Sequence, residues 1–269
     1  MMRAGQKCYP CPRTPVTHVS GLYSGERGAK LINGTIRAMQ RLWSAFVKFV
    51  LLAIVGGILL LSFAVLMANR QLPSLDALMA FRHSSGYVKL GDFPHTLPEA
   101  VVAIEDDRFY LHDGVDYVGV MRAGIANLSD ELSQGASTIT MQVARNFFLS
   151  RQKTYTRKLY EILLAYRIEH ALGKDEILEL YLNKIYLGQG AYGFAEAADT
   201  YFGKPVDQLT LAECAMLAGL PKAPSANNPV VNPRRARQRQ TYILLRMMEL
   251  GRITRAQYDA ALLEPLRLR

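Results

Sequence analysis

The chain has 269 residues, half of them hydrophobic and a fifth charged, and it carries 32 Lys and Arg against 23 Asp and Glu. This apolar content excludes an intrinsically disordered protein, and three cysteines are too few for a disulfide-stapled mini-domain. The length allows one large domain or two small ones. A net charge of +9 is compatible with a nucleic-acid binder, so its distribution decides what it means.

Most of the excess positive charge lies in the first 48 residues, which hold eight basic side chains and one acid. Residues 49–68 carry no charge, and residues 69–269 have a net charge of only +2. The basicity is therefore a property of an N-terminal tail, and we expect no nucleic-acid partner.

The uncharged segment 49–68 predicts a single transmembrane helix, because twenty helical residues span about 30 Å, the thickness of a bilayer's hydrocarbon core. Trp43 lies just before it, where interfacial aromatics are enriched. A buried helix of a soluble protein is the alternative. The positive-inside rule predicts that residues 1–48 are a cytoplasmic tail and that residues 69–269 lie outside the cytoplasm.

The cysteines indicate no metal centre. Cys8 and Cys11 form one C-x-x-C pair in the Pro-rich tail, and two thiolates without a second pair do not make a tetrahedral zinc site. A chance spacing explains them. Cys214 is expected to pack inside a helix.

Residues 69–95 are predicted to be a connector, and the chain beyond it is predicted to be a succession of helices. Helical spacing of apolar residues, Ser or Thr caps and terminal glycines mark them. The expected helices start near Pro98 and Thr210 and span Thr154–Leu172, Asp175–Leu187, Arg234–Leu250 and a last segment after Thr254. Because no segment shows sustained alternation of apolar and polar residues, the predicted class is all-α.

Five carboxylates and a histidine gather within Glu105–Asp116, at the end of a predicted helix that leads into a glycine turn. Crowded carboxylates raise one another's pKa, which suits a general acid or base. One histidine with scattered acids is a weak metal pattern. A solvated acidic helix end is the structural alternative.

A second segment, Gln134–Asn146, contains a Gly-Ala-Ser-Thr turn before a helix, which either exposes backbone N–H groups to an anion or is an ordinary helix cap. A third segment has five cations and no acid, and Glu161 follows Arg157 and Lys158 at helical spacing. These cations are Arg145, Arg151, Lys153, Arg157 and Lys158. The third segment is either a salt-bridged surface or a strip that binds a pyrophosphate.

Together these segments resemble the peptidoglycan glycosyltransferases of glycosyltransferase family 51, in particular the N-terminal part of class A penicillin-binding proteins. Five motifs occur in the family's order across residues 95–265. They begin with Glu105-Asp-Asp-Arg-Phe-Tyr, Gly135-Ala-Ser-Thr, Arg157-Lys158-x-x-Glu161, Glu179-Leu-Tyr-Leu-Asn and Leu209-Thr-Leu-Ala-Glu. Ala136 and Met141 replace a Gly and a Gln that are common in the family. Arg145 stands where a Lys is common, and Lys153 stands where an Arg is common.

The resemblance implies a lysozyme-like, two-lobed helical glycosyltransferase domain at residues 96–269, anchored by one helix in the bacterial inner membrane. It implies that lipid II is polymerised into glycan strands by inverting transfer from a lipid-pyrophosphate donor to a sugar 4-hydroxyl. Glu105 is the candidate base, and Glu161 is the second catalytic carboxylate, which orders the cations or helps bind a metal ion. The implied substrate-binding residues are Ser137, Gln142, Arg145, Lys153, Arg157 and Lys158.

By the same resemblance, Mg²⁺ or Mn²⁺ is the candidate cofactor, no organic cofactor is expected, and the partners are lipid II, the lipid-linked strand, the membrane and other cell-wall synthesis and division proteins. A lytic hydrolase and a non-enzymatic membrane partner are competing interpretations. A crosslinking domain would need a K-T-G sequence, but no Lys follows Lys222. The chain is therefore expected to be a monofunctional enzyme or the front part of a bifunctional one.

Overall fold

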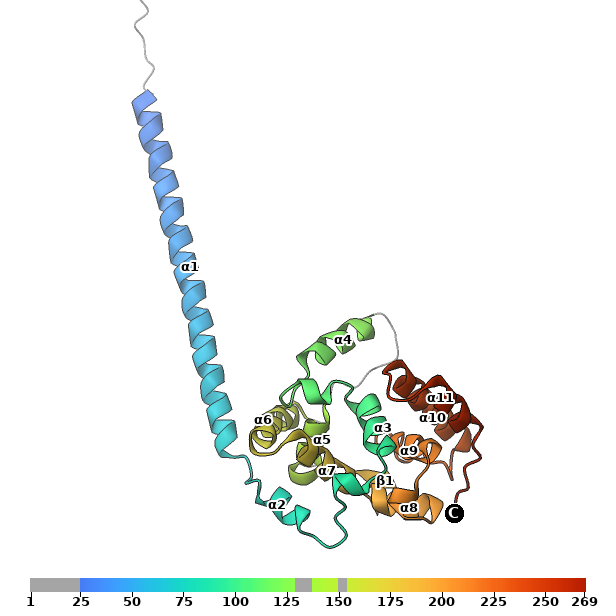
Figure 1. Cartoon of the computed structure of the whole chain (residues 1–269). Helices are drawn as coiled ribbons and strands as arrows, with labels where there is room; N and C mark the ends of the chain where they lie inside the picture. The colour runs from blue at the N-terminus through green and yellow to red at the C-terminus, as the bar shows by residue number, and fades with distance from the viewer. Residues whose placement is uncertain (1–24, 129–136, 150–153) are drawn as a thin grey trace, which may run out of the picture. The chain divides into compact units, whose positions relative to one another are not determined.

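The structure, a computed structural model, describes residues 25–128, 137–149 and 154–269. The chain divides into two compact units, residues 1–65 and 66–269. The first unit is described from Gly25, where helix α1 (Gly25–Arg70) begins (Figure 1). Cys8 and Cys11 lie outside the described residues.

Helix α1 contains the predicted apolar segment. Its part from Met39 to Arg70 is long and apolar enough to cross a membrane, and none of its most apolar window is buried inside the protein. No other helix among the described residues meets this criterion. The single apolar N-terminal helix is thus confirmed, and it extends past the predicted limits 49–68 on both sides. The limits of the tail, connector and domain remain predictions.

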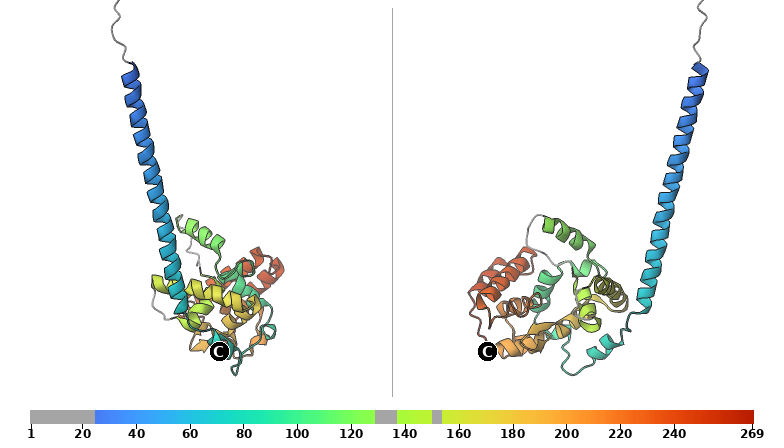
Figure 2. Two further views of the ribbon diagram at one scale, coloured as in Figure 1. Left: turned by 90° about the vertical axis from the view of Figure 1, so that its left-hand side faces the viewer. Right: turned by 180° about the vertical axis from the view of Figure 1, so that it is seen from behind.

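The second unit is built almost wholly from helices (Figures 1 and 2). The α-helices are α2 (Asp76–Arg82), α3 (Thr96–Glu105), α4 (Tyr117–Leu128), α5 (Ile139–Phe148), α6 (Tyr155–Ala171), α7 (Lys174–Lys184), α8 (Phe194–Phe202), α9 (Leu211–Ala218), α10 (Pro233–Glu249) and α11 (Arg255–Leu263). Short 3₁₀ turns are η1 (Leu90–Asp92), η2 (Phe109–Leu111) and η3 (Val206–Gln208).

Two groups of helices form this unit. Helix α5 packs against α6 and α7, whereas α3 packs against α9 and α10, and α10 packs against α11. Figure 1 and the rear view in Figure 2 show these groups on opposite sides. One continuous apolar core that includes Phe109, Tyr181 and Phe194 joins them. The predicted all-α, two-lobed class is confirmed.

The helix predicted over Asp175–Leu187 is wrong at its C-terminal end. Helix α7 ends at Lys184, and Tyr186–Gly188 instead forms strand β1, which pairs antiparallel with β2 (Ala191–Tyr192). Gly188, Gln189 and Gly190 all have positive φ, which builds the tight connection. Strands of three and two residues are too short to show the alternation that marks a strand in the sequence.

The helix starts follow the sequence closely. The Thr154 side chain accepts from the N–H of Arg157 at the start of α6, and Thr210 and Thr254 form capping boxes with Glu213 and Gln257. Each such cap stabilises a helix by about 1 kcal/mol. The caps predicted at Thr210 and Thr254 are therefore confirmed.

Helix α7 holds the segment that leads into α3. The Asn183 side chain exchanges hydrogen bonds with the backbone of Val88, donating to its carbonyl at 2.8 Å and accepting from its N–H at 2.9 Å. One turn earlier, Glu179 accepts from the N–H of Leu90 at 2.9 Å. These contacts fix the polypeptide just before the helix that ends at Glu105.

Gly193, at the start of α8, has φ +84°, and a Cβ there would lie 2.6 Å from the carbonyl oxygen of Asn183. We expect Gly193→Ala to destabilise the second unit by about 2 kcal/mol or more, because backbone strain and a backbone clash add. Denaturant unfolding monitored by circular dichroism measures this loss.

Gly190→Ala is the matched control, since Gly190 has φ +83° and no atom lies within 4 Å of its Cβ position. It should lose only the strain contribution. Equal losses for the two variants would contradict a role for the close approach to Asn183.

Candidate active site

Glu105 is the last residue of α3, and its carboxylate faces α5. The Gln142 amide donates to its Oε2 at 2.8 Å. Burial raises the pKa of Glu105 above its usual range, and the Gln142 hydrogen bond and the charges of Arg239, Lys222 and Arg145 oppose this rise. The residue as a whole is partly exposed. A carboxylate with raised proton affinity is suited to act as a general base.

Gln142 is held in one orientation. Its oxygen accepts from Tyr181 Oη at 3.4 Å and from Arg145 Nη2 at 3.5 Å, so its amide nitrogen is directed at Glu105. Tyr181 is fully buried in α7, and proximity to Glu105 adds to the burial that raises the pKa of this phenol. The α5 and α7 side chains thus set the hydrogen bond that Glu105 receives.

Asp106 fastens the end of α3 to the start of α5. Its Oδ2 accepts from the N–H of Ile139 at 3.0 Å, and its carboxylate lies 3.0 and 3.1 Å from Nε2 of His112. Both side chains are nearly fully buried. The backbone carbonyl of His112 in turn accepts from Lys174 Nζ at 2.5 Å. Glu105 and Gln142 consequently keep a fixed separation.

The turn before α5 is part of the same network. The Thr138 hydroxyl donates to the carbonyl of Gly114 at 2.6 Å and accepts from the N–H of Met141 at 3.2 Å. Gly114 has φ +84°, and a Cβ there would lie 3.1 Å from the backbone of Ala165 on α6. The structure shows Thr138 as the helix cap, while Gly135 and Ala136 of this turn lie outside the described residues, so anion binding by the turn stays a prediction.

Glu161 forms a second centre on α6. It is 1% exposed, and its oxygens lie 3.3 Å from Arg157 Nε and 3.2 Å from Lys158 Nζ. Lys158 Nζ also donates to the Ser137 hydroxyl at 2.9 Å and contacts the Met141 sulfur at 3.4 Å. The predicted spacing therefore places both cations on one carboxylate, and Lys158 extends the cluster to α5.

The structure brings seven of the eight predicted site residues into two neighbourhoods that meet on α5. Glu105, Gln142 and Arg145 form one, and Ser137, Arg157, Lys158 and Glu161 form the other. Lys153 lies outside the described residues. The catalytic and binding roles of all eight residues remain predictions.

Arg239 and Lys222 were not among the predicted site residues, yet they are the two charges that most strongly oppose the raised pKa of Glu105. Arg239 lies on α10 in an arginine-rich stretch that resembles a solvated helix face. Its guanidinium lies 5.4 Å from the centroid of the Tyr242 ring, and its Nε is buried without a hydrogen-bond partner among the described residues. A Cβ at Gly219 would come within 2.9 Å of the Arg239 Cγ, so this glycine makes room for the side chain.

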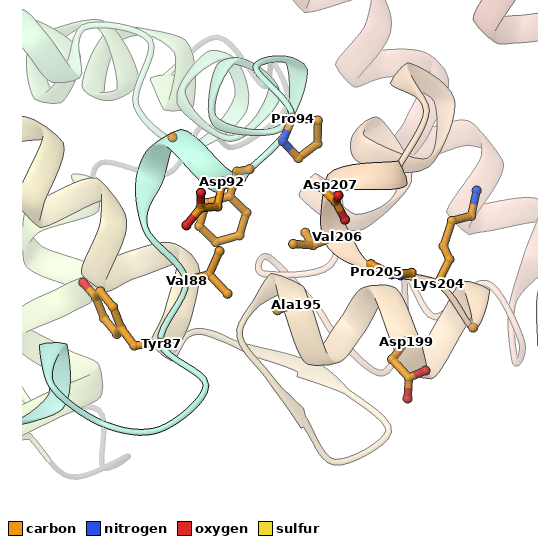
Figure 3. Close-up of a pocket in the computed structure, with 13 residues that line it drawn as sticks. Tyr87, Val88, Asp92, Pro94, Ala195, Asp199, Lys204, Pro205, Val206 and Asp207 are labelled. Atoms are coloured by element: carbon orange, nitrogen blue, oxygen red, sulfur yellow. The ribbon is translucent and has the colours of Figure 1, made fainter.

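A cavity of about 800 Å³ lies elsewhere, between Tyr87–Pro94 and the α8–η3 region (Figure 3). Figure 3 shows Val88, Ala195 and Val206 around it, with Asp92 and Asp207 nearby. None of the predicted site residues lines this cavity. The chemistry of the side chains, and not this cavity, therefore locates the candidate site.

Comparisons with known proteins identify the family of the chain. Residues 74–248 match the family model described as Transglycosylase. A Cupriavidus necator protein named "Putative transglycosylase" is 78% identical over 231 residues, which cover 86% of this chain and 100% of that protein. Penicillin-binding protein 1A of Neisseria gonorrhoeae is 53% identical over 233 residues, covering 79% of this chain and 29% of that protein.

The crystal structure of penicillin-binding protein 1A from Haemophilus influenzae matches 68% of this chain and 18% of its own, with 33% identity and a TM-score of 0.42. The chain therefore spans less than a third of the length of these penicillin-binding proteins.

The chain is a helical glycosyltransferase with one long apolar N-terminal helix among its described residues. The chain belongs to the transglycosylase family. It is a peptidoglycan transglycosylase, and the family predicted from its five motifs is confirmed.

Because Arg239 favours the charged form of Glu105, we expect Arg239→Gln to raise the pKa of Glu105 further. The acid limb of the pH–rate profile for glycan synthesis should then move to higher pH, since a base must be deprotonated to act. Arg239→Lys keeps the charge and should leave the limb near its wild-type position. A uniform loss of rate at every pH, with the limb unmoved, would contradict this electrostatic role.

Proposed function

We propose that the protein polymerises lipid II into glycan strands, with the lipid-linked strand as donor and lipid II as acceptor. The observation that carries this proposal is the arrangement on α5. On one side Gln142 holds the base candidate Glu105, and on the other Ser137 meets the cations ordered by Glu161. A general base and an anion-binding cluster thus flank one short helix.

The reaction needs both groups. A sugar 4-hydroxyl is a weak nucleophile, and Glu105 would remove its proton as the oxygen attacks C1 of the donor sugar. The bond between C1 and the lipid pyrophosphate breaks at the same time, and the pyrophosphate leaves with the electron pair. Since the donor linkage is α and the product β, one inverting displacement suffices.

The leaving group determines the role of the cations. Pyrophosphate departs as an anion and needs positive charge where its own charge develops, while a general acid is dispensable. Arg145, Arg157 and Lys158 supply that charge, with Lys153 from the same segment as a further candidate. A lytic hydrolase releases a neutral sugar, and that reaction gives no reason for such a cluster.

The divalent cation stays a proposal. Both oxygens of Glu161 already face cations, and no three His, Cys, Asp or Glu side chains gather within the described residues. These side chains do not by themselves fit Mg²⁺ or Mn²⁺. A metal ion would need oxygen ligands from the lipid pyrophosphate, and no step above passes through it.

We also propose the orientation and the partners. The basic residues before the uncharged segment 49–68 favour a cytoplasmic N-terminus, which places residues 69–269 on the outer side of the bacterial inner membrane, where lipid tails keep the substrates near the anchor. Cell-wall synthesis and division proteins are the expected partners.

Incubating the full chain in detergent with purified lipid II, with and without moenomycin, tests the activity. Cleavage of finished peptidoglycan without polymer formation would instead indicate a lytic enzyme.

Glu105→Gln should lower lipid II polymerisation by about 10²- to 10⁴-fold, the usual contribution of a general base, while lipid II binding persists. Product gels and a separate binding measurement check both expectations. Glu99→Gln is the matched control, because Glu99 lies on the same helix and pairs with Arg252 away from the site. Near-normal turnover of the Glu105 variant would remove this residue from the base role.

Lys158→Gln should lower the polymerisation rate by about 10²-fold, because it removes a charged donor from the pyrophosphate cluster. Lys89→Gln is its control: Lys89 also contacts a largely buried glutamate, Glu179 at 3.5 Å, but lies outside the site. Initial rates at saturating lipid II measure the effect. If the two variants lost the same fraction of the polymerisation rate, the loss would be a general effect of removing a lysine–glutamate ion pair, and the specific role of Lys158 would be contradicted.

A further inference from the structure

The carboxylate of Asp107 binds arginines from two different helices. Its Oδ1 lies 3.2 Å from Arg122 Nη2 on α4, and its Oδ2 lies 2.7 Å from Arg246 Nη2 on α10. The Asp107 side chain is 14% exposed, against 47% for Arg122 and 29% for Arg246. One carboxylate, two residues after Glu105, therefore bridges α4 and α10.

Few other side-chain contacts hold residues 117–122, the part of α4 whose side chains the structure describes. Between residues 117 and 122, the exposed side chains are Tyr117, Val118, Val120, Met121 and Arg122. Two of them hydrogen-bond to other elements: Tyr117 Oη lies 2.5 Å from Tyr166 Oη on α6, and Arg122 binds Asp107. Because residues 117–122 bury little apolar surface, these polar ties hold the start of α4.

Asp107 connects α4 to the surroundings of the base. Arg246 and Arg239 are seven residues apart on α10, so they lie on the same face of that helix, two turns from each other. Arg239 is one of the cations that oppose the raised pKa of Glu105, and Arg246 holds Asp107. Helix α4 also belongs to the stretch of chain between His112 and Ser137, which both sit in the network around α5.

We propose that Asp107 is a positioning residue that ties α4 to α10 and thereby sets how long the glycan strand stays bound between additions. This inference rests on the proposed polymerase function. A glycan polymer extends beyond the sugar that reacts at Glu105, so the elements on either side of Glu105 would flank the rest of the strand. Asp107 acts through α4, and the side chains that contact the reacting groups are separate from it.

The energetics favour an effect on strand length. Mean strand length is the ratio of the addition rate to the release rate, so a change in release alters length in proportion. A partly exposed ion pair shifts an equilibrium by about two- to fivefold. Removing the tie should therefore shorten strands by about this factor while the rate of the chemical step stays similar. Salt should shorten wild-type strands in the same direction, since it screens this pair.

The test compares Asp107→Asn and Arg122→Gln with wild type in the full-length protein, using purified lipid II. We expect median strand length to fall about two- to fivefold and initial lipid II consumption to stay within about twofold. The double variant should shorten strands no further than either single variant, and Asp107→Glu should restore part of the length. Asp259→Asn, which breaks the exposed Arg255–Asp259 pair on α11, is the matched control and should leave length unchanged.

Thermal unfolding of each variant separates positioning from general destabilisation. Unchanged strand length in both single variants, or shortening that follows the loss of thermal stability and also occurs in Asp259→Asn, would overturn the inference. So would a lower rate at unchanged length. If wild type forms no polymer from lipid II, the proposed function itself fails, and that result differs from polymer whose length is insensitive to Asp107.

Discussion

The site depends on one buried carboxylate that is not itself a candidate catalyst. Asp106 accepts from the backbone N–H of Ile139 and from His112, and it thereby joins the end of α3 to the start of α5. Glu105 precedes it in the chain, and Gln142 lies one helical turn after Ile139. A buried carboxylate that lost either partner would be costly, so this contact strongly favours one arrangement of the two helices. The contact between Asp106 and Ile139 therefore positions the side chains of α5 relative to Glu105.

Glu105 shows how burial and charge are balanced around a base. Burial raises the pKa of Glu105, which favours the protonated form, and a protonated carboxyl cannot accept a proton from a hydroxyl. Gln142 on α5, Arg239 on α10 and Lys222 after α9 offset this from three directions. Because these groups come from both helix groups of the domain, the proton affinity of Glu105 is a property of the assembled fold.

The sequence predicted the local parts of the fold well and the long-range parts only through motifs. The caps at Thr210 and Thr254 and the pairing of Glu161 with Arg157 and Lys158 depend on residues three or four positions apart, which helical geometry fixes. The hairpin after Lys184 was missed, because its strands are too short to alternate.

Residues that reach the site from distant parts of the chain are harder to predict from the sequence. Arg239 looked like a solvated helix residue, since only packing of α10 on α3 brings it near Glu105. Gly219 is the signal that was available: a glycine where a Cβ would meet Arg239 indicates close approach, yet a sequence does not say what approaches. Tyr181 also gave no clear sequence signal, because a buried tyrosine in a helix more often packs in the core than belongs to a site.

The two glutamates are suited to different tasks, and their contacts explain why. Both oxygens of Glu161 face cations, and the side chain is almost fully closed to solvent, so no oxygen of Glu161 is exposed to a substrate hydroxyl. In the described part of the chain, the hydrogen bond that Glu105 accepts comes from a neutral amide on one oxygen, and the residue remains partly open. Glu161 is therefore suited to hold cations in place for an anionic leaving group, and Glu105 to take up a proton. The short helix α5 contacts the surroundings of both: its Gln142 donates to Glu105, and its Met141 contacts Lys158, the partner of Glu161, so one helix positions the groups around each carboxylate.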